Sequence, residues 1–116
     1  MIYHGIDLVE VARITHAYTR WGDRFLTRVF TSTECERYRD RPESLAARFA
    51  AKEAVAKLLG VGIRGLGGDQ HPQAVEWTEI ELLNDPQGKP LLHLHGRAAA
   101  RAAALHLRDL AVSISH

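Results

Sequence analysis

The segment SLAARFAAKEAVAKLLG, residues 44–60, constrains the fold of this chain more than any other stretch. Ser44 belongs to the residue types that cap helix N-termini, and Gly60 belongs to those that end helices. Thirteen of the fifteen residues between them are good helix formers. The segment therefore predicts a long helix that the rest of a small domain must pack around.

A lysine interrupts the apolar face of this predicted helix. The apolar stripe consists of Leu45, Phe49, Ala56 and Leu59. At about 100° per residue, Lys52 projects into the middle of that stripe. On the adjoining edge Glu53 and Lys57 stand beside a groove floored by the methyl groups of Ala46 and Ala50.

Two interpretations fit this pattern. In the first, Glu53 and Lys57 form an i,i+4 surface ion pair, and Lys52 extends its ammonium group to solvent. In the second, local rules are broken here because the helix carries part of a functional site.

Length and charge limit the classes of protein that the chain can belong to. Its 116 residues suit one domain, 1–116, with one modest core. A net charge of +1 provides no global field for nucleic acid or an anionic membrane, so we expect neither as a partner. The single cysteine, Cys35, cannot form an internal disulfide, and no apolar run has the length of a signal segment or membrane span, which favours a cytoplasmic protein.

Hydrophobic periodicity and turn residues predict the order β, α, α, α, β, β, α, β. The expected elements are a strand at 2–9, a helix at 10–19, a loop followed by a helix capped by Thr31, Ser32 or Thr33, the helix at 44–59, a glycine-rich loop at 60–74, a hairpin at 76–95, an alanine-rich helix at 96–107 and a strand at 110–116. This order predicts an α+β fold, with three to four helices packed on a largely antiparallel sheet.

Asp7 is an isolated acid in the apolar strand predicted at 2–9, where it serves either as a turn former or as a partner of Glu53. Two carboxylates brought together repel each other unless a cation lies between them. Mg²⁺ prefers such oxygen ligands and completes its shell with water and substrate phosphates. One hypothesis is therefore a Mg²⁺-dependent phosphate chemistry with Asp7 and Glu53 as ligands and Lys57 as a phosphate contact.

Four motifs, in order, resemble those of a known enzyme family: GIDLVEVARI, RFAAKEAVAKLLG, GKPLLHLHGRA and VSISH. They are similar to the holo-acyl carrier protein synthases, the small phosphopantetheinyl transferases. The resemblance covers nearly the whole chain and is weakest at 31–43 and 61–75. GxD at 5–7 followed by FxxKExxxK at 49–57 is its most specific part.

The resemblance implies a phosphopantetheinyl transferase-like fold and a reaction. Enzymes of this family move 4′-phosphopantetheine from coenzyme A to a serine of apo-acyl carrier protein, release adenosine 3′,5′-bisphosphate and serve fatty acid biosynthesis. Asp7 and Glu53 match the family's magnesium ligands. The general base is either Glu53 or a metal-bound water held by Asp7.

The resemblance also suggests residues that bind coenzyme A. Lys57 and Arg48 are expected to contact phosphates, and Lys52 matches the lysine of the family motif. Ser115 and His116 resemble the segment that receives the nucleotide's 3′-phosphate from a neighbouring subunit, so a homotrimer with sites at its interfaces is expected. The family's chain usually continues past this histidine with another strand, so we expect either that the sequence is truncated after His116 or that this strand is absent.

A locally basic flank covers residues 10–28. Acyl carrier proteins are acidic, and in the family the first helix docks the carrier, which makes Arg13, Arg24 and Arg28 the expected contacts. The alternative is a set of scattered, solvated arginines.

Rival functions use the same residues differently. A Mg²⁺-dependent phosphohydrolase would cleave coenzyme A or a nucleotide with water, and a non-catalytic subunit would bind the carrier without turnover. A transition-metal site at His93 and His95 is disfavoured because no third ligand has a recognisable spacing, and Cys35 lacks an evident catalytic partner. The preferred carrier and the tolerance for acyl-coenzyme A are not predictable from the sequence.

Overall fold

The computed structural model describes residues 8–64 and 74–105. Its elements in chain order are α1 (Leu8–Trp21), α2 (Asp23–Val29), α3 (Ser32–Tyr38), α4 (Pro42–Leu59), the 3₁₀ turn η1 (Trp77–Glu79), β1 (Ile80–Asn84), β2 (Pro90–Leu94) and α5 (Gly96–Leu105). Within the described ranges, five α-helices pack with one antiparallel two-stranded sheet. The predicted α+β fold is confirmed.

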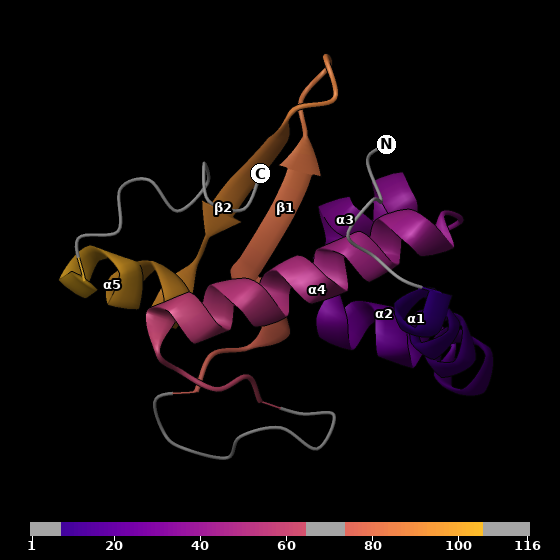
Figure 1. The fold of residues 1–116 in the computed structure, drawn as a ribbon, viewed down its shortest axis with the longest axis horizontal. Coiled ribbons are helices and arrows are strands. Elements are labelled where there is room, and N and C mark those ends of the chain that lie inside the picture. The colour runs from indigo at the N-terminus through magenta and orange to yellow at the C-terminus, as the bar shows by residue number, and fades with distance from the viewer. Residues whose placement is uncertain (1–7, 65–73, 106–116) are drawn as a thin grey trace.

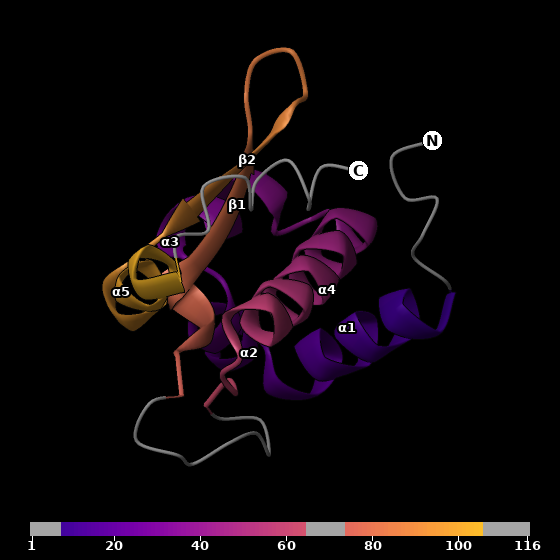
Figure 2. The same ribbon diagram turned by 60° about the vertical axis from the view of Figure 1, so that its left-hand side comes forward.

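Helix α4 occupies the centre of the molecule (Figure 1). It contacts α1 and α3, and it also contacts β1 and α5. Turning the molecule shows α1 running alongside α4, with the hairpin and α5 on the other side of α4 (Figure 2). The helix that dominates the sequence pattern is therefore the element around which the others assemble. No helix in the two described ranges has both the length and the apolar character needed to span a bilayer.

The N-terminal half contains one helix that the sequence pattern predicts and one that it misses. The helix predicted at 10–19 is confirmed as α1, although α1 already begins at Leu8, so the last two residues of the strand predicted at 2–9 are helical. Residues 1–7 lie outside the described residues. The loop predicted before residue 31 is wrong, because α2 forms there and buries Phe25, Leu26 and Val29 on one face.

Helix α3 begins with one of the three predicted caps. The Thr31 hydroxyl accepts a hydrogen bond from the Glu34 backbone N–H at 3.1 Å, and the Glu34 carboxylate accepts one from the Thr31 N–H at 2.9 Å. This reciprocal capping box satisfies two backbone donors of the first turn.

Helix α4 starts two residues earlier than predicted. Pro42 occupies the first turn, where its missing N–H costs nothing, and Ser44 is buried in that turn and does not cap it. The predicted end is confirmed, since Gly60 adopts the left-handed conformation with φ 70°. Arg101 of α5 donates from Nε to the Leu59 carbonyl at 2.9 Å and so ties α5 to this helix end.

The predicted hairpin is confirmed, with Leu82 opposite Leu92 in the β1–β2 register. The turn η1 precedes it, so β1 begins at Ile80, later than the predicted residue 76. Helix α5 confirms the predicted alanine-rich helix. The predicted strand at 110–116 lies outside the described residues.

The edge of β1 that does not face β2 is bonded to side chains of α3 and α4. Lys52 Nζ donates to the Ile80 carbonyl, and Arg48 Nε donates to the Leu82 carbonyl at 2.8 Å. Glu34 Oε2 accepts from the Leu82 N–H at 2.9 Å. Charged side chains thus complete the hydrogen bonding of a strand edge that the helices bury, as a buried backbone requires.

Lys52 and Glu34 also form an ion pair at 2.8 Å, and both side chains are 0% exposed. Burial lowers the pKa of Lys52, while the Glu34 carboxylate opposes that shift by favouring the ammonium form. Loss of one partner from such a buried pair leaves an uncompensated charge and costs about 3–5 kcal/mol. The pair therefore locks α4, α3 and β1 together.

Glu81 makes a second link between β1 and the start of α3. Its carboxylate accepts hydrogen bonds from the Thr31 hydroxyl and lies 3.1 Å from His95 Nε2. Burial favours the protonated form, but these hydrogen bonds and the neighbouring imidazoles outweigh it, so the pKa of Glu81 lies below its usual range. Two carboxylates thus hold the hairpin to α3: Glu81 accepts from the Thr31 hydroxyl, and Glu34 accepts from the Leu82 N–H.

Candidate functional site

A cavity of about 560 Å³ opens between α1, α2, the C-terminal half of α4, residues 61–63 and η1. Its apolar wall includes Ile14, Phe25, Phe49, Ile63 and Trp77. The charged side chains that line it are Arg13, Glu53 and Lys57. A cavity of this size, largely apolar and with a few convergent charges, is the usual form of a ligand site.

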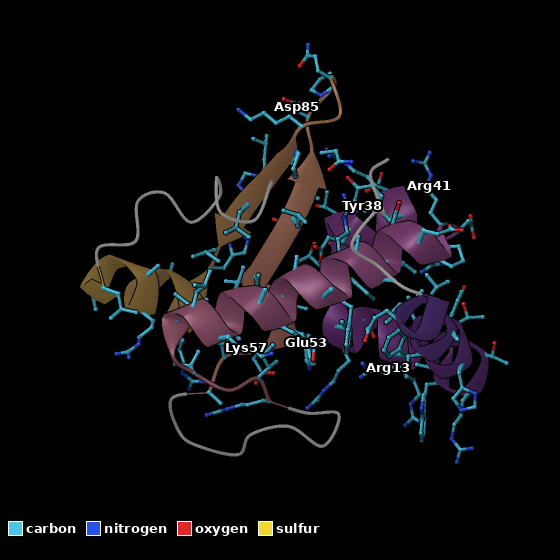
Figure 3. The ribbon with its side chains drawn as sticks, viewed as in Figure 1. Arg13, Tyr38, Arg41, Glu53, Lys57 and Asp85 are labelled. Atoms are coloured by element: carbon cyan, nitrogen blue, oxygen red, sulfur yellow. The ribbon has the colours of Figure 1, made fainter. Side chains whose placement is uncertain are left out.

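The two neighbouring residues Lys52 and Glu53 face different parts of the molecule. Consecutive residues of an α-helix point about 100° apart. Lys52 therefore bonds to β1, while Glu53 lines the cavity together with Phe49 and Lys57, which lie one turn before and after it. Figure 3 shows Glu53 and Lys57 along one edge of α4, with Arg13 of α1 on the same side of the molecule.

Glu53 and Lys57 do not pair with each other. In the described part of the chain, no hydrogen bond or ion pair engages the carboxylate of Glu53 or the ammonium of Lys57. The alternative prediction of an i,i+4 surface ion pair is therefore wrong. A half-buried carboxylate and an exposed ammonium, both unengaged and beside one cavity, remain available to a ligand.

The groove predicted beside these charges has a different floor. Ala46 is 0% exposed and packs in the core, and neither Ala46 nor Ala50 lines the cavity. Phe49 and Ala56 line it instead.

The structure places Arg48 and Lys52, both predicted to contact coenzyme A, away from the cavity. Arg48 is 3% exposed, donates to the Leu82 carbonyl and stacks its guanidinium 3.4 Å from the centre of the Tyr38 ring. Lys52 is fully buried against Glu34. Both side chains supply donors to carbonyl groups of β1, and their predicted contact with coenzyme A stays a prediction.

Three predicted site residues, Asp7, Ser115 and His116, lie outside the described residues. The structure consequently neither joins Asp7 to Glu53 nor separates them. In the ranges 8–64 and 74–105, no group of three His, Cys, Asp or Glu side chains is placed to hold a metal ion. His93 and His95 are both exposed, and His95 is bonded to Glu81.

Cys35 is buried, and burial raises the pKa of its thiol. The nearby Arg39 guanidinium opposes that shift without cancelling it. A protonated, enclosed thiol is a packing residue and a poor nucleophile.

The predicted basic flank lies beside the mouth of the cavity. Arg13 lines the cavity and forms an exposed ion pair with Glu10 at 2.9 Å. Arg24 and Arg28 are exposed on α2, and no ion pair engages either within the described residues. Trp21, at the end of α1, is 50% exposed and also lines the cavity.

The sequence pattern does not indicate the contributions of Phe25 and Trp77 to the cavity. Phe25 lies in the helix that was missed, and Trp77 falls in a stretch that was predicted to be a strand. Their only sequence signal is apolar character, which core residues share.

Comparison with known proteins gives one family. A family model described as the 4′-phosphopantetheinyl transferase superfamily matches residues 4–115. A holo-[acyl-carrier-protein] synthase from Herpetosiphon aurantiacus is 56% identical over 117 residues, which covers 100% of this chain and 90% of that protein. A protein of the same name from Chloroflexus aurantiacus is 54% identical over 124 residues, again covering 100% and 90%.

Solved structures give the same result for the fold. The holo-[acyl-carrier-protein] synthase from Neisseria meningitidis superposes with a TM-score of 0.65 at 29% identity, covering 83% of this chain and 73% of that one. The enzyme from Helicobacter pylori, solved in complex with coenzyme A, gives a TM-score of 0.63 at 25% identity and covers 83% and 74%.

Proposed function

The chain belongs to the 4′-phosphopantetheinyl transferase superfamily, and on that premise we propose that it is a holo-[acyl-carrier-protein] synthase. It transfers 4′-phosphopantetheine from coenzyme A to a serine hydroxyl of apo-acyl carrier protein and releases adenosine 3′,5′-bisphosphate. The observation that carries this proposal is the cavity that brings Glu53, Lys57 and Arg13 together in a chain 56% identical throughout to a relative of that name.

The reaction requires the site to hold a pyrophosphate, remove a proton from a serine hydroxyl and stabilise the charge of the leaving phosphate. Lys57 has an unengaged ammonium at the cavity edge, which suits contact with a phosphate. Glu53 has an unengaged carboxylate one turn earlier on the same helix face. We assign the acid–base and charge-binding roles to this pair, together with Asp7.

The residues present are compatible with a Mg²⁺ ion bound jointly with the substrate. Mg²⁺ commonly takes one or two protein carboxylates and completes its shell with water and phosphate oxygens. The unengaged Glu53 supplies one such carboxylate, and Asp7 is proposed as the second. When bound, the ion would neutralise charge on the coenzyme A pyrophosphate.

We propose that the active form is a homotrimer in which Ser115 and His116 of one subunit contact the 3′-phosphate held by the next. The support for this arrangement is the resemblance of the segment VSISH to the family segment that meets a neighbouring subunit. Light scattering should give a solution mass of three chains. A mass of one chain would refute the trimer.

We propose that the enzyme acts in the cytoplasm and supplies holo-carrier protein to fatty acid biosynthesis. The two rival functions, phosphohydrolase and non-catalytic carrier-binding subunit, are not favoured, because full-length relatives above 50% identity are named as synthases.

The transfer itself is the first prediction. Purified chain, coenzyme A, Mg²⁺ and apo-acyl carrier protein should yield a carrier heavier by one phosphopantetheine group, as measured by intact mass. Glu53→Gln keeps the size of the side chain but removes its charge, and it should lower the rate at least about a hundredfold. EDTA should stop transfer by the unmodified chain.

Each other outcome has a distinct meaning. Cleavage of coenzyme A without a gain in carrier mass would identify a phosphohydrolase. Carrier binding with intact coenzyme A would identify a non-catalytic subunit. Full activity of Glu53→Gln would remove Glu53 from the site, provided that circular dichroism shows both chains folded.

The basic flank leads to a prediction about carrier binding. If α1 and α2 dock an acidic carrier, KM for the carrier should rise with ionic strength, because salt screens exposed charges. The double variant Arg24→Glu, Arg28→Glu should raise that KM about tenfold at low salt and leave KM for coenzyme A unchanged. The matched control is the double variant Arg41→Glu, Arg97→Glu, which reverses two exposed arginines outside α1 and α2. Equal effects of the two charge reversals would contradict docking at this flank.

A further inference from the structure

Trp77 has a buried hydrogen-bond donor that finds no partner among the described residues. The residue is 6% exposed and lines the cavity, and its indole nitrogen Nε1 is buried and makes no hydrogen bond within residues 8–64 and 74–105. Buried polar groups in native structures are nearly always paired, and an unpaired donor costs about 1–3 kcal/mol. Such an exception in the wall of a proposed substrate cavity calls for an acceptor that arrives with a ligand.

Packing fixes the orientation of this indole. Its ring stacks on the ring of Phe49 with centroids 4.6 Å apart and planes inclined by 20°. The Arg13 guanidinium lies 5.4 Å from the centre of the same Phe49 ring. Phe49 precedes Glu53 by one turn of α4, so the indole belongs to the same wall as the proposed catalytic carboxylate.

The chemistry of the wall identifies the part of the substrate that suits Trp77. Coenzyme A consists of a nucleotide, a charged pyrophosphate and a pantetheine arm, which is largely apolar and carries two amides. Phosphates would be drawn to the cations Lys57 and Arg13. A neutral N–H in a wall formed by Phe25, Phe49 and Ile63 suits a neutral acceptor on an apolar chain, which is an amide carbonyl.

We propose that the indole N–H of Trp77 donates a hydrogen bond to an amide carbonyl of the pantetheine arm of coenzyme A. Trp77 would then contribute to the selection of coenzyme A by recognising its pantetheine arm. This inference rests on the proposed function and extends it to one further residue. Because Nε1 is closed off from water, the carbonyl reaches it only when the cavity wall adjusts, so binding must change the surroundings of the indole.

The chain has only two tryptophans, so its indole N–H signals are simple to assign. In a ¹⁵N–¹H spectrum the indole signals belong to the buried Trp77 and the half-exposed Trp21, and Trp21→Phe identifies them. Coenzyme A and 4′-phosphopantetheine should both move the Trp77 indole proton downfield, as a new hydrogen bond requires. Adenosine 3′,5′-bisphosphate, which lacks the arm, should not. An unmoved Trp77 signal in the presence of bound coenzyme A would overturn the proposal, as would an equal shift with the bisphosphate.

Kinetics provide a second, independent readout. Trp77→Phe keeps an aromatic ring against Phe49 but removes the donor, and it should raise KM for coenzyme A about fivefold with little change in kcat. In the Trp21→Phe background, a benzothienylalanine at position 77 keeps the ring shape without the N–H and should have the same effect on KM. If this isosteric residue leaves KM unchanged, the hydrogen bond does not exist.

Failure of this inference is distinguishable from failure of the proposed function. If the unmodified chain modifies the carrier but neither Trp77 readout responds, only the role of Trp77 is wrong. If no transfer occurs and coenzyme A does not bind, the proposed function and the role of Trp77 both fail.

Discussion

The packing of this molecule depends on how the buried edge of β1 is hydrogen bonded. Lys52 and Arg48 donate to the Ile80 and Leu82 carbonyls, and Glu34 accepts the Leu82 N–H, so side chains stand where a neighbouring strand would otherwise lie. The spacing allows this because four residues of a helix rise about 6 Å, close to the rise of about 6.7 Å for two residues of a strand. Each turn of α4 thus meets one outward-facing peptide group of β1, which fixes how the hairpin sits on the helix.

That constraint divides α4 into two faces. The face with Lys52 holds the fold, because its ammonium is paired with Glu34 away from water. The face about 100° away presents Glu53 and Lys57 to the cavity, where neither is engaged by another side chain of the described residues. A helix whose other face is fixed to β1 and α3 is a suitable support for a site, since catalytic groups need positions held by their surroundings. The motif KExxxK thus combines one anchoring lysine with an acid and a lysine that line the cavity.

Much of the fold and part of the candidate site could be predicted from the sequence. The kind of signal that each prediction used also explains which features were missed. Periodicity and turn chemistry predict α4 and the hairpin correctly, because both signals are local. Helix α2 is missed because seven residues after Gly22 contain too few turns for a pattern to emerge. The charge at Lys52 is visible as an irregularity, but only the fold reveals its acceptors. The Glu34 carboxylate lies 18 residues earlier in the chain, and the two carbonyl acceptors lie 25 and 28 residues later. That the Trp77 indole N–H finds no partner within the described ranges likewise has no signature in the sequence.

Two lysines of α4 test most directly whether one face of the helix anchors the fold while the face that lines the cavity binds coenzyme A. Lys52→Met and Lys57→Met would be compared by urea unfolding. Their affinity for coenzyme A would be measured under conditions in which each variant is folded. We expect Lys52→Met to lose about 3 kcal/mol or more of unfolding free energy and to bind coenzyme A normally when folded. Lys57→Met should keep its stability and bind coenzyme A about tenfold more weakly. A Lys52→Met chain of full stability that no longer binds coenzyme A would contradict the account.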